Sequence, residues 1–263
     1  MNNYENVLEQ FKSSGWGTLE SLKAKEKEAK KEEETDEVEK EVEEEKPEVP
    51  KRKLNFVTIY GQIRRDTLNN VITSNPIGTE PDKQNRFHVS INSHGGCVTT
   101  SLNIIDWFKS QPKEAIAVCG GRNSSAATLI ISAMNLRLAY PSSRFMMHDM
   151  ISTADGTNAD LKSRMRDVQD IRDQLIQAYV ENVGLTRKEV ERIIDHDNFF
   201  NATEALNLGT KGLVDGIILK HLGDFKMEIM MRDGIIKTVD LIDDDLIGIK
   251  DLAVAKVTQG KTE

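Results

Sequence analysis

Ser125 occupies a position where a serine hydroxyl could become a nucleophile. It follows the glycine pair Gly120-Gly121 and precedes a run of small and apolar residues that starts at Ala126, which predicts that it stands between a strand and a helix. Backbone N–H groups in the first turn of a helix lack internal partners and create a positive field. Such a field stabilises an oxyanion, as acyl transfer requires. Serine is also a preferred helix N-cap, so Ser124 and Ser125 could equally serve only that purpose.

A catalytic serine also needs a base, a group that orients the base, and donors for the oxyanion. The sequence offers candidates of each kind. His148 ends a predicted strand over residues 144–148. Asp195 and Asp197 follow a predicted helix, and Gly95-Gly96 follow another predicted strand. Either carboxylate could orient an imidazole, so the residues alone leave the choice between them open.

Other chemistries find less support in the sequence. The five histidines form no H-E-x-x-H or H-x-x-x-H pair, so no metal site is predicted. Cys97 and Cys119 are too few for a disulfide framework and are expected to be reduced. No G-x-S-x-G elbow is present, which argues against an α/β-hydrolase. Beside the glycine pair, His94 could act as a competing base and Cys97 as a nucleophile, but an exposed turn residue and a small packing residue explain them better.

The elements expected around these residues alternate between strands and helices, which is typical of an α/β fold with mainly parallel strands. The two glycine-rich turns then lie at the same end of one sheet. Strands are predicted over 55–60, 86–91, 115–119, 136–140 and 144–148, and helices over 98–110, from about 125, and over 157–183.

The longest predicted helix, over 157–183, has apolar residues at helical spacing, although its first half is mostly charged. Gly184 is a typical C-terminal stop. Thr186 and Glu189 then form a capping box, which predicts the start of another helix.

Three parts are expected along the chain. Residues 1–50 carry 16 acidic and 8 basic side chains, which accounts for the whole formal charge of −8. This acidic extension is predicted to be disordered, although apolar residues before Glu20 would also suit a short docking peptide. Residues 51–225 form the predicted catalytic domain. Residues 226–263 comprise a hairpin, turning at Asp233-Gly234, and a tail.

The body of the chain is electrically neutral, which argues against a nucleic-acid face. Its longest apolar runs are too short to cross a membrane, and no signal sequence is recognised at the N-terminus. We therefore expect a cytoplasmic protein with no nucleic-acid or membrane partner.

Four segments resemble successive motifs of the ClpP family of serine peptidases and follow the family's order. The similarity extends over roughly Leu54 to Ile218. It implies a crotonase-like ClpP fold, an α/β fold with repeated β-β-α units, in which the helix over 157–183 is a projecting handle. The segments are Asn92–Gly96, Gly121–Ser125, Pro141–His148 and Asp195–Phe199.

The resemblance also implies roles for individual residues. Ser125 corresponds to the nucleophile, His148 to the base and Asp197 to the acid. The backbone N–H groups of Gly96 and Ala126 correspond to the oxyanion hole. These assignments follow from the family's separations, 29 residues from Gly96 to Ser125 and 49 residues from His148 to Asp197.

The chain departs from the family at several positions next to these residues, and one such difference is that Asn123 and Ser124 replace the alanines before the nucleophile. His94 replaces the proline before the glycine pair, and Asp149 replaces the glutamine usual after the catalytic histidine. None of these changes removes a catalytic atom.

From this resemblance we expect a serine endopeptidase that hydrolyses peptides or unfolded proteins inside a homo-oligomeric ring, without a cofactor or metal. An ATP-dependent AAA+ unfoldase is the partner that the family implies. The acidic extension stands where the family forms its entrance and docking surface, so a ClpP-related phage head-maturation protease is an alternative. That enzyme would act without an ATPase on capsid or scaffold proteins and be virion-associated during assembly. A crotonase-fold acyl-CoA enzyme and an inactive structural subunit are further alternatives, which an intact triad disfavours.

Overall fold

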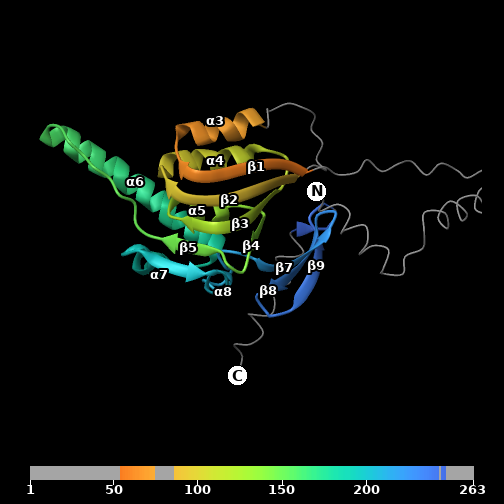
Figure 1. Cartoon of the computed structure of the whole chain (residues 1–263). Helices are drawn as coiled ribbons and strands as arrows, with labels where there is room; N and C mark the ends of the chain where they lie inside the picture. Colours follow the sequence, from red (N-terminus) through yellow and green to blue (C-terminus); the bar gives the residue numbers. More distant parts are fainter. Residues whose placement is uncertain (1–53, 75–85, 243, 247–263) are drawn as a thin grey trace, which may run out of the picture. The chain divides into compact units, whose positions relative to one another are not determined.

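The structure is a computed structural model that describes residues 54–74, 86–242 and 244–246, all within the structural unit formed by residues 51–263. These residues form one nine-stranded sheet with helices packed against it (Figure 1). The predicted α/β fold is confirmed. The predicted extension over 1–50 and the end of the predicted tail lie outside the described residues.

The sheet is parallel through its centre and antiparallel at one side. Its main path runs β1-β2-β3-β4-β7-β8-β9. The first five strands of this path are β1 (Leu54–Ile63), β2 (Arg86–Gly96), β3 (Ala115–Ser124), β4 (Leu136–Ala139) and β7 (Gly216–Gly223), all paired in parallel. The antiparallel hairpin of β8 (Lys226–Met231) and β9 (Ile236–Asp240) completes the path, as predicted. Two short strands lie off it, β5 (Arg144–Met147) and β6 (Asn198–Asn201).

Alternate residues of β3 face two different hydrophobic cores. Ala115 and Ala117 belong to the larger core, which contains the buried residues of the helices. Ile116 and Val118 belong to a second core on the other face, where they pack with buried residues of the β8–β9 hairpin. Because both faces of β3 are covered, its first half is apolar at every position, as is typical of a central parallel strand.

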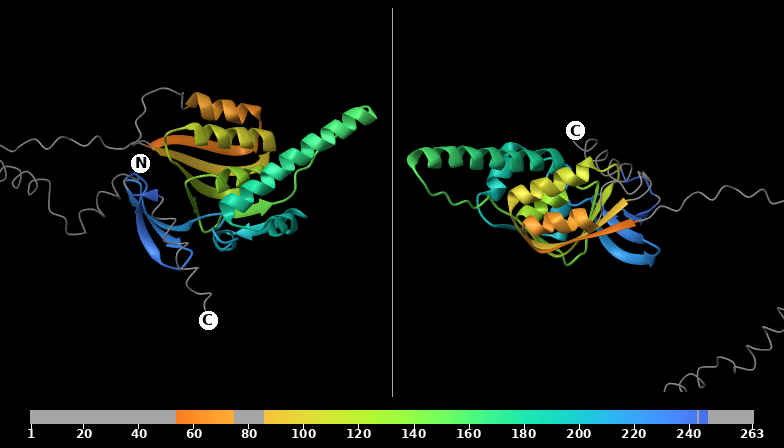
Figure 2. Two further views of the ribbon diagram at one scale, coloured as in Figure 1. Left: turned by 180° about the vertical axis from the view of Figure 1, so that it is seen from behind. Right: turned by 90° about the horizontal axis from the view of Figure 1, so that it is seen from above.

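Helices α3 and α4 lie next to each other, and α4 in turn contacts α5 (Figures 1 and 2). Their bounds and those of the remaining helices are α3 (Arg65–Ser74), α4 (Val98–Ser110), α5 (Ala126–Ser132), α6 (Asn158–Val183), α7 (Arg187–Ile194) and α8 (Ala202–Leu206).

Helix α6 projects from the body as a long arm (Figure 2). It begins after Thr157, which forms a capping box with Asp160, and ends at Gly184 in the left-handed conformation that favours glycine. Its N-terminal half is largely exposed, with Met165 64 % exposed. Only its C-terminal half carries buried residues, which are Leu175, Ile176, Tyr179 and Val183.

A buried ion pair connects the end of α6 to the sheet. Arg137 of β4 donates from Nε to the Asp215 carboxylate at 2.9 Å and from Nη1 to the carbonyl of Asn182 at 3.0 Å. Asp215 also accepts the backbone N–H of Arg137 at 2.8 Å. A buried pair of this kind is stable only when further hydrogen bonds satisfy both groups, as they do here. The base of the arm is therefore fixed to β4.

Candidate active site

Strand β3 continues beyond its predicted end. The pattern predicted a turn at Gly120-Gly121, but both glycines lie within the strand, which extends to Ser124. Gly121 has a φ of 56°, so the chain bends there and then continues. After the bend, residues 122–124 pair in parallel with residues 144–146 of β5. This pairing brings the serine segment next to the histidine strand.

Ser125 forms a strained elbow between β3 and α5. Its φ of 55° and ψ of −129° are unusual for a residue that carries a side chain. The backbone is fixed on both sides, since the Ser125 N–H donates to the carbonyl of Met146 at 2.7 Å. The Ser125 carbonyl accepts from both the backbone N–H and the hydroxyl of Thr128, at 2.9 and 2.7 Å. Ser124 is buried, whereas Ser125 is half-buried.

His148 and Asp197 are brought together by the antiparallel pairing of β5 with β6. The register places Met147 opposite Asn198, so the residues just outside this last pair are His148 and Asp197. His148 Nε2 lies 2.7 Å from Ser125 Oγ, and His148 Nδ1 lies 3.4 Å from Asp197 Oδ1. The histidine side chain is 19 % exposed and the aspartate side chain 60 % exposed. The three side chains thus form a chain of contacts from carboxylate to imidazole to hydroxyl.

Asp195, the other candidate acid, lies elsewhere. It caps the C-terminus of α7 and is exposed. Within the described part of the chain, no ion pair joins it to His148, and the carboxylate beside the imidazole is that of Asp197.

Gly95 and Gly96 were predicted to follow a strand over 86–91, but both lie within the end of β2, where they pair with β1. This end of β2, which we call the glycine turn, lies directly against the serine elbow. A Cβ atom added at Gly95, whose φ is 87°, would lie 2.4 Å from the carbonyl oxygen of Ser124 and 2.7 Å from the Cβ of Ser125. The same position is 3.0 Å from the backbone nitrogen of Ala126, the first residue of α5. Only glycine permits this approach. The turn and the N-terminus of α5 therefore face a common point beside Ser125.

Ser93 holds the glycine turn in place from the other side. Its buried hydroxyl donates to the carbonyl of Gly61 at 2.6 Å and accepts the N–H of Gly95 at 3.1 Å. A Cβ at Gly96 would lie 2.3 Å from the carbonyl oxygen of Ile63, so β1 limits movement of the turn in that direction.

Two supporting residues were not predicted from the sequence. The hydroxyls of Thr128 and Tyr179 lie 2.8 Å apart, which connects the elbow to helix α6. Burial raises the pKa of Tyr179 to about 12. The role of Thr128 could have been found from the sequence, because a threonine three residues after a helix N-cap can donate its hydroxyl to the carbonyl of the N-cap residue. Tyr179 gave none, since its position in the apolar stripe of α6 predicts packing only.

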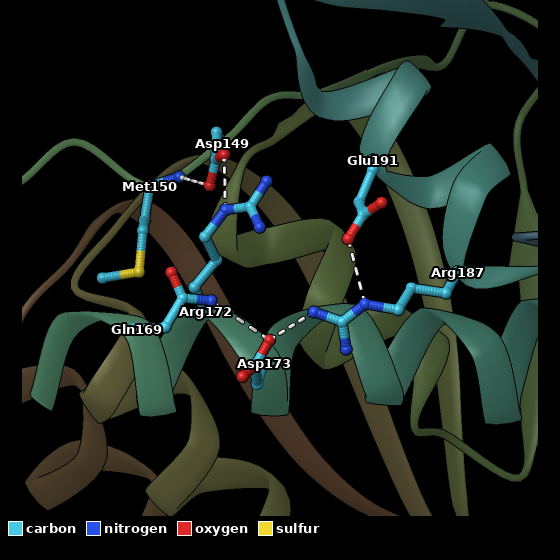
Figure 3. A network of polar contacts seen from close by, with 7 residues as sticks. All are labelled: Asp149, Met150, Gln169, Arg172, Asp173, Arg187 and Glu191. Carbon is cyan, nitrogen blue, oxygen red and sulfur yellow. Dashed lines mark hydrogen bonds and ion pairs between the residues drawn. The ribbon is translucent and has the colours of Figure 1, made fainter. Parts of the chain in front are cut away.

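Helix α6 also contacts the residue after His148 (Figure 3). The Asp149 carboxylate accepts from Nε of Arg172 at 2.7 Å and from the backbone N–H of Met150 at 2.8 Å. The backbone N–H of Asp149 donates to the carbonyl of Ile194 at 2.8 Å, at the end of α7. Asp149 is therefore bonded to both helices.

The same stretch of α6 is joined to the start of α7 by another ion pair. Asp173 accepts from Arg187, and Arg187 also donates from Nε to Glu191 at 2.9 Å (Figure 3). The hydrogen bond from Arg187 lowers the pKa of the Asp173 carboxyl. The N-terminal end of α7 is thus held against α6.

The rival residues lie in less suitable places. His94 is exposed, as expected, but it lies within β2 and not in a turn. Cys97 is exposed at the N-terminus of α4, where burial acts to raise the pKa of its thiol but hydrogen bonds from Thr100 and Thr99 outweigh it and lower that pKa. No hydrogen bond or ion pair in the described chain links Cys97 to a histidine.

Among the described residues, no group of three or more His, Cys, Asp and Glu side chains is arranged to hold a metal ion. None of the helices in this part of the chain has the length and apolar character of a membrane span.

Comparison of the sequence with known proteins finds matches to one family. A family model described as Clp protease matches residues 51–221. The ATP-dependent Clp protease proteolytic subunit of Pleurastrum terricola is 30 % identical over 162 residues, which cover 60 % of this chain and 82 % of that protein. The ATP-dependent Clp protease proteolytic subunit 2 of Prochlorococcus marinus (strain NATL2A) is 30 % identical over 166 residues, which cover 62 % and 82 % respectively.

The close approach of the glycine turn to the elbow predicts a strong effect of Gly95→Ala. The added methyl group would displace the Ser125 segment, so the rate at which a fluorophosphonate labels Ser125 should fall by at least about tenfold, as small misplacements of a reactive group do. Gly234→Ala is the matched control, because Gly234 also has positive φ, 77°, but has open space around its Cβ position. Equal labelling rates in the two variants, measured by mass spectrometry, would show that the contact with the elbow is unimportant.

Proposed function

The chain belongs to the Clp protease family, and from that membership and the geometry of the site we propose that it is a serine endopeptidase whose nucleophile is Ser125. The observation that carries the proposal is the 2.7 Å contact between His148 Nε2 and the hydroxyl of Ser125. A base at hydrogen-bond distance from a serine on a strained elbow is the arrangement that nucleophilic catalysis requires.

In the proposed reaction, Ser125 Oγ attacks the carbonyl carbon of a peptide bond while His148 Nε2 takes the hydroxyl proton. The negative charge that develops on the carbonyl oxygen is stabilised by the backbone N–H groups of Gly96 and Ala126. Collapse of this intermediate breaks the C–N bond, and His148 gives its proton to the leaving amine. Water then attacks the acyl-enzyme, with His148 accepting a proton from the water and returning one to Ser125.

Asp197 orients the base in this scheme. For Nε2 to accept a proton, the neutral imidazole of His148 carries its hydrogen on Nδ1, which faces the Asp197 carboxylate. The carboxylate then stabilises the imidazolium that forms when the serine is deprotonated. Its distance of 3.4 Å and the exposure of Asp197 make this the looser of the two contacts of His148.

We further propose that the chain forms a homo-oligomeric ring and works with an ATP-dependent unfoldase on peptides or unfolded proteins. The curated relatives are named as proteolytic subunits of an ATP-dependent Clp protease, which favours this role over phage head maturation. The projecting half of α6 supports assembly, because Met165 is exposed and Leu161 and Val168 are only half-buried within a charged surface. Apolar residues on an arm of this kind are stabilised when a partner covers them.

Replacing the nucleophile tests the enzymatic proposal most directly. Ser125→Ala should reduce hydrolysis of a fluorogenic peptide by at least about 10⁴-fold, because Ser125 carries the one hydroxyl that is bonded to His148 Nε2 among the residues that the structure describes. Ser124→Ala is the matched control and should retain most of the activity, with circular dichroism checking that both variants fold. Similar turnover in the two variants would refute Ser125 as the nucleophile.

The assignment of Asp197, and not Asp195, as the residue that orients His148 can be tested with a second pair of variants. Asp197→Asn should lower kcat by about 10²- to 10⁴-fold, because the amide no longer favours the reactive tautomer of His148. Asp195→Asn should change kcat by less than about tenfold, since an exposed carboxylate away from the imidazole contributes little. Steady-state kinetics of both variants at one pH give the ranking. A larger loss of kcat in Asp195→Asn than in Asp197→Asn would identify Asp195 as the residue that orients His148.

Assembly through the arm predicts a change in particle size. Leu161→Asp combined with Met165→Asp should give smaller particles and lower activity, because two carboxylates would replace the apolar contact. Lys162→Asp adds the same change in charge at a neighbouring exposed position and should leave the particle intact. Light scattering coupled to size exclusion measures both variants. A wild-type monomer, or equal disruption by the control, would argue against assembly through this helix.

A further inference from the structure

Helix α6 lies outside the sheet that holds the candidate triad, yet it is bonded to the residue next to His148 (Figure 3). We propose that the ion pair between Asp149 and Arg172 is a positioning element that fixes the His148 imidazole against Ser125. This inference rests on the proposed function and adds two positioning residues to it. Neither residue takes part in proton transfer.

The backbone around His148 needs such an element. The pairing of β5 with β6 ends at Met147, so His148 is the first residue beyond the strand. Residues 151–156 have no regular structure and are exposed. Asp149 is therefore the point at which the chain after His148 is fixed, through its N–H bond to Ile194 and its carboxylate bond to Arg172.

The position of the pair gives it more strength than an ordinary surface ion pair. The side chains of Arg172 and Asp149 are 26 % and 35 % exposed, and the hydrogen bond from Nε is short, at 2.7 Å. By contrast, Arg164, nearer the start of the same helix, pairs with Asp155 in the preceding loop, and these side chains are 56 % and 97 % exposed. Short charge-assisted hydrogen bonds in a partly buried place are stronger than exposed pairs, which solvent screens.

The contacts also close into a frame that includes the acid segment. Arg172 is followed on α6 by Asp173, which binds Arg187 at the start of α7. The far end of α7 carries Ile194, whose carbonyl accepts the N–H of Asp149. The chain then leads within three residues to Asp197. A shift of α6 at Arg172 would therefore change the placement of His148 relative to both its neighbours in the triad.

Loss of the pair should affect catalysis more than substrate binding. Arg172→Gln and Asp149→Asn should each lower kcat for a fluorogenic peptide by about tenfold or more, since a small displacement of the base is sufficient to slow proton transfer. KM should stay within about twofold, because the pair acts on the base. The double variant should be no worse than either single variant, as expected when two residues act through one shared contact. Arg172→Lys, which keeps the charge, should recover part of the loss.

Arg164→Gln is the matched control, because it removes an ion pair of an arginine on the same helix without touching Asp149, and it should leave kcat unchanged. Melting temperature and particle size are measured for every variant. The inference is overturned if the single variants keep kcat within twofold of wild type, if their losses add in the double variant, or if the losses follow melting temperature or particle size. A wild type that neither hydrolyses peptide nor reacts with fluorophosphonate would overturn the proposed function and this inference together. An active wild type with unaffected variants overturns the inference alone.

Discussion

Strand β5 is only four residues long, but it is hydrogen-bonded to the serine strand on one side and to the acid strand on the other. Its parallel pairing with residues 122–124 brings the serine elbow beside it, and the carbonyl of Met146 accepts the N–H of Ser125. Its antiparallel pairing with β6 brings Asp197 to the end where His148 follows. The three candidate catalytic residues lie far apart in the sequence, and the pairing of the strands next to them brings their backbones together. The side chain of His148 is then close enough to contact those of Ser125 and Asp197.

The backbone strain at Ser125 is maintained by the packing around it. A residue in this conformation costs on the order of 1–3 kcal/mol, so the rest of the structure has to hold it there. On one side the elbow meets the glycine turn at Gly95, which leaves no space for a side chain. On the other side α5 is buried at every position, and Thr128 bonds the Ser125 carbonyl while contacting Tyr179 of α6. Burial of the apolar residues of α5 thus offsets the strain of the residue that precedes them.

The sequence predicted those parts of the fold that depend on local pattern. The helix over 98–110 has the predicted bounds, and the long helix begins after Thr157 and ends before Gly184, close to the predicted range of 157–183. The extension of β3 beyond Gly121 was not predicted, because it depends on pairing with a strand more than twenty residues away. Strand β6 was missed for a similar reason, since it forms by pairing with β5, which lies far from it in the sequence. The candidate site residues came from resemblance to a family, whereas Asp149, Arg172 and Tyr179 contribute contacts that spacing along the chain does not reveal.

The two contacts of His148 differ in how firmly the structure holds them. The contact with Ser125 is determined within the sheet, where both residues adjoin paired strands. The contact with Asp197 depends on a carboxylate that is 60 % exposed and 3.4 Å away, so water screens much of its attraction for the imidazole. A screened carboxylate selects the tautomer of His148 more readily than it fixes the position of the ring. The orientation of the base therefore depends heavily on its own backbone, which is fixed after β5 by the bonds of Asp149 to α6 and α7.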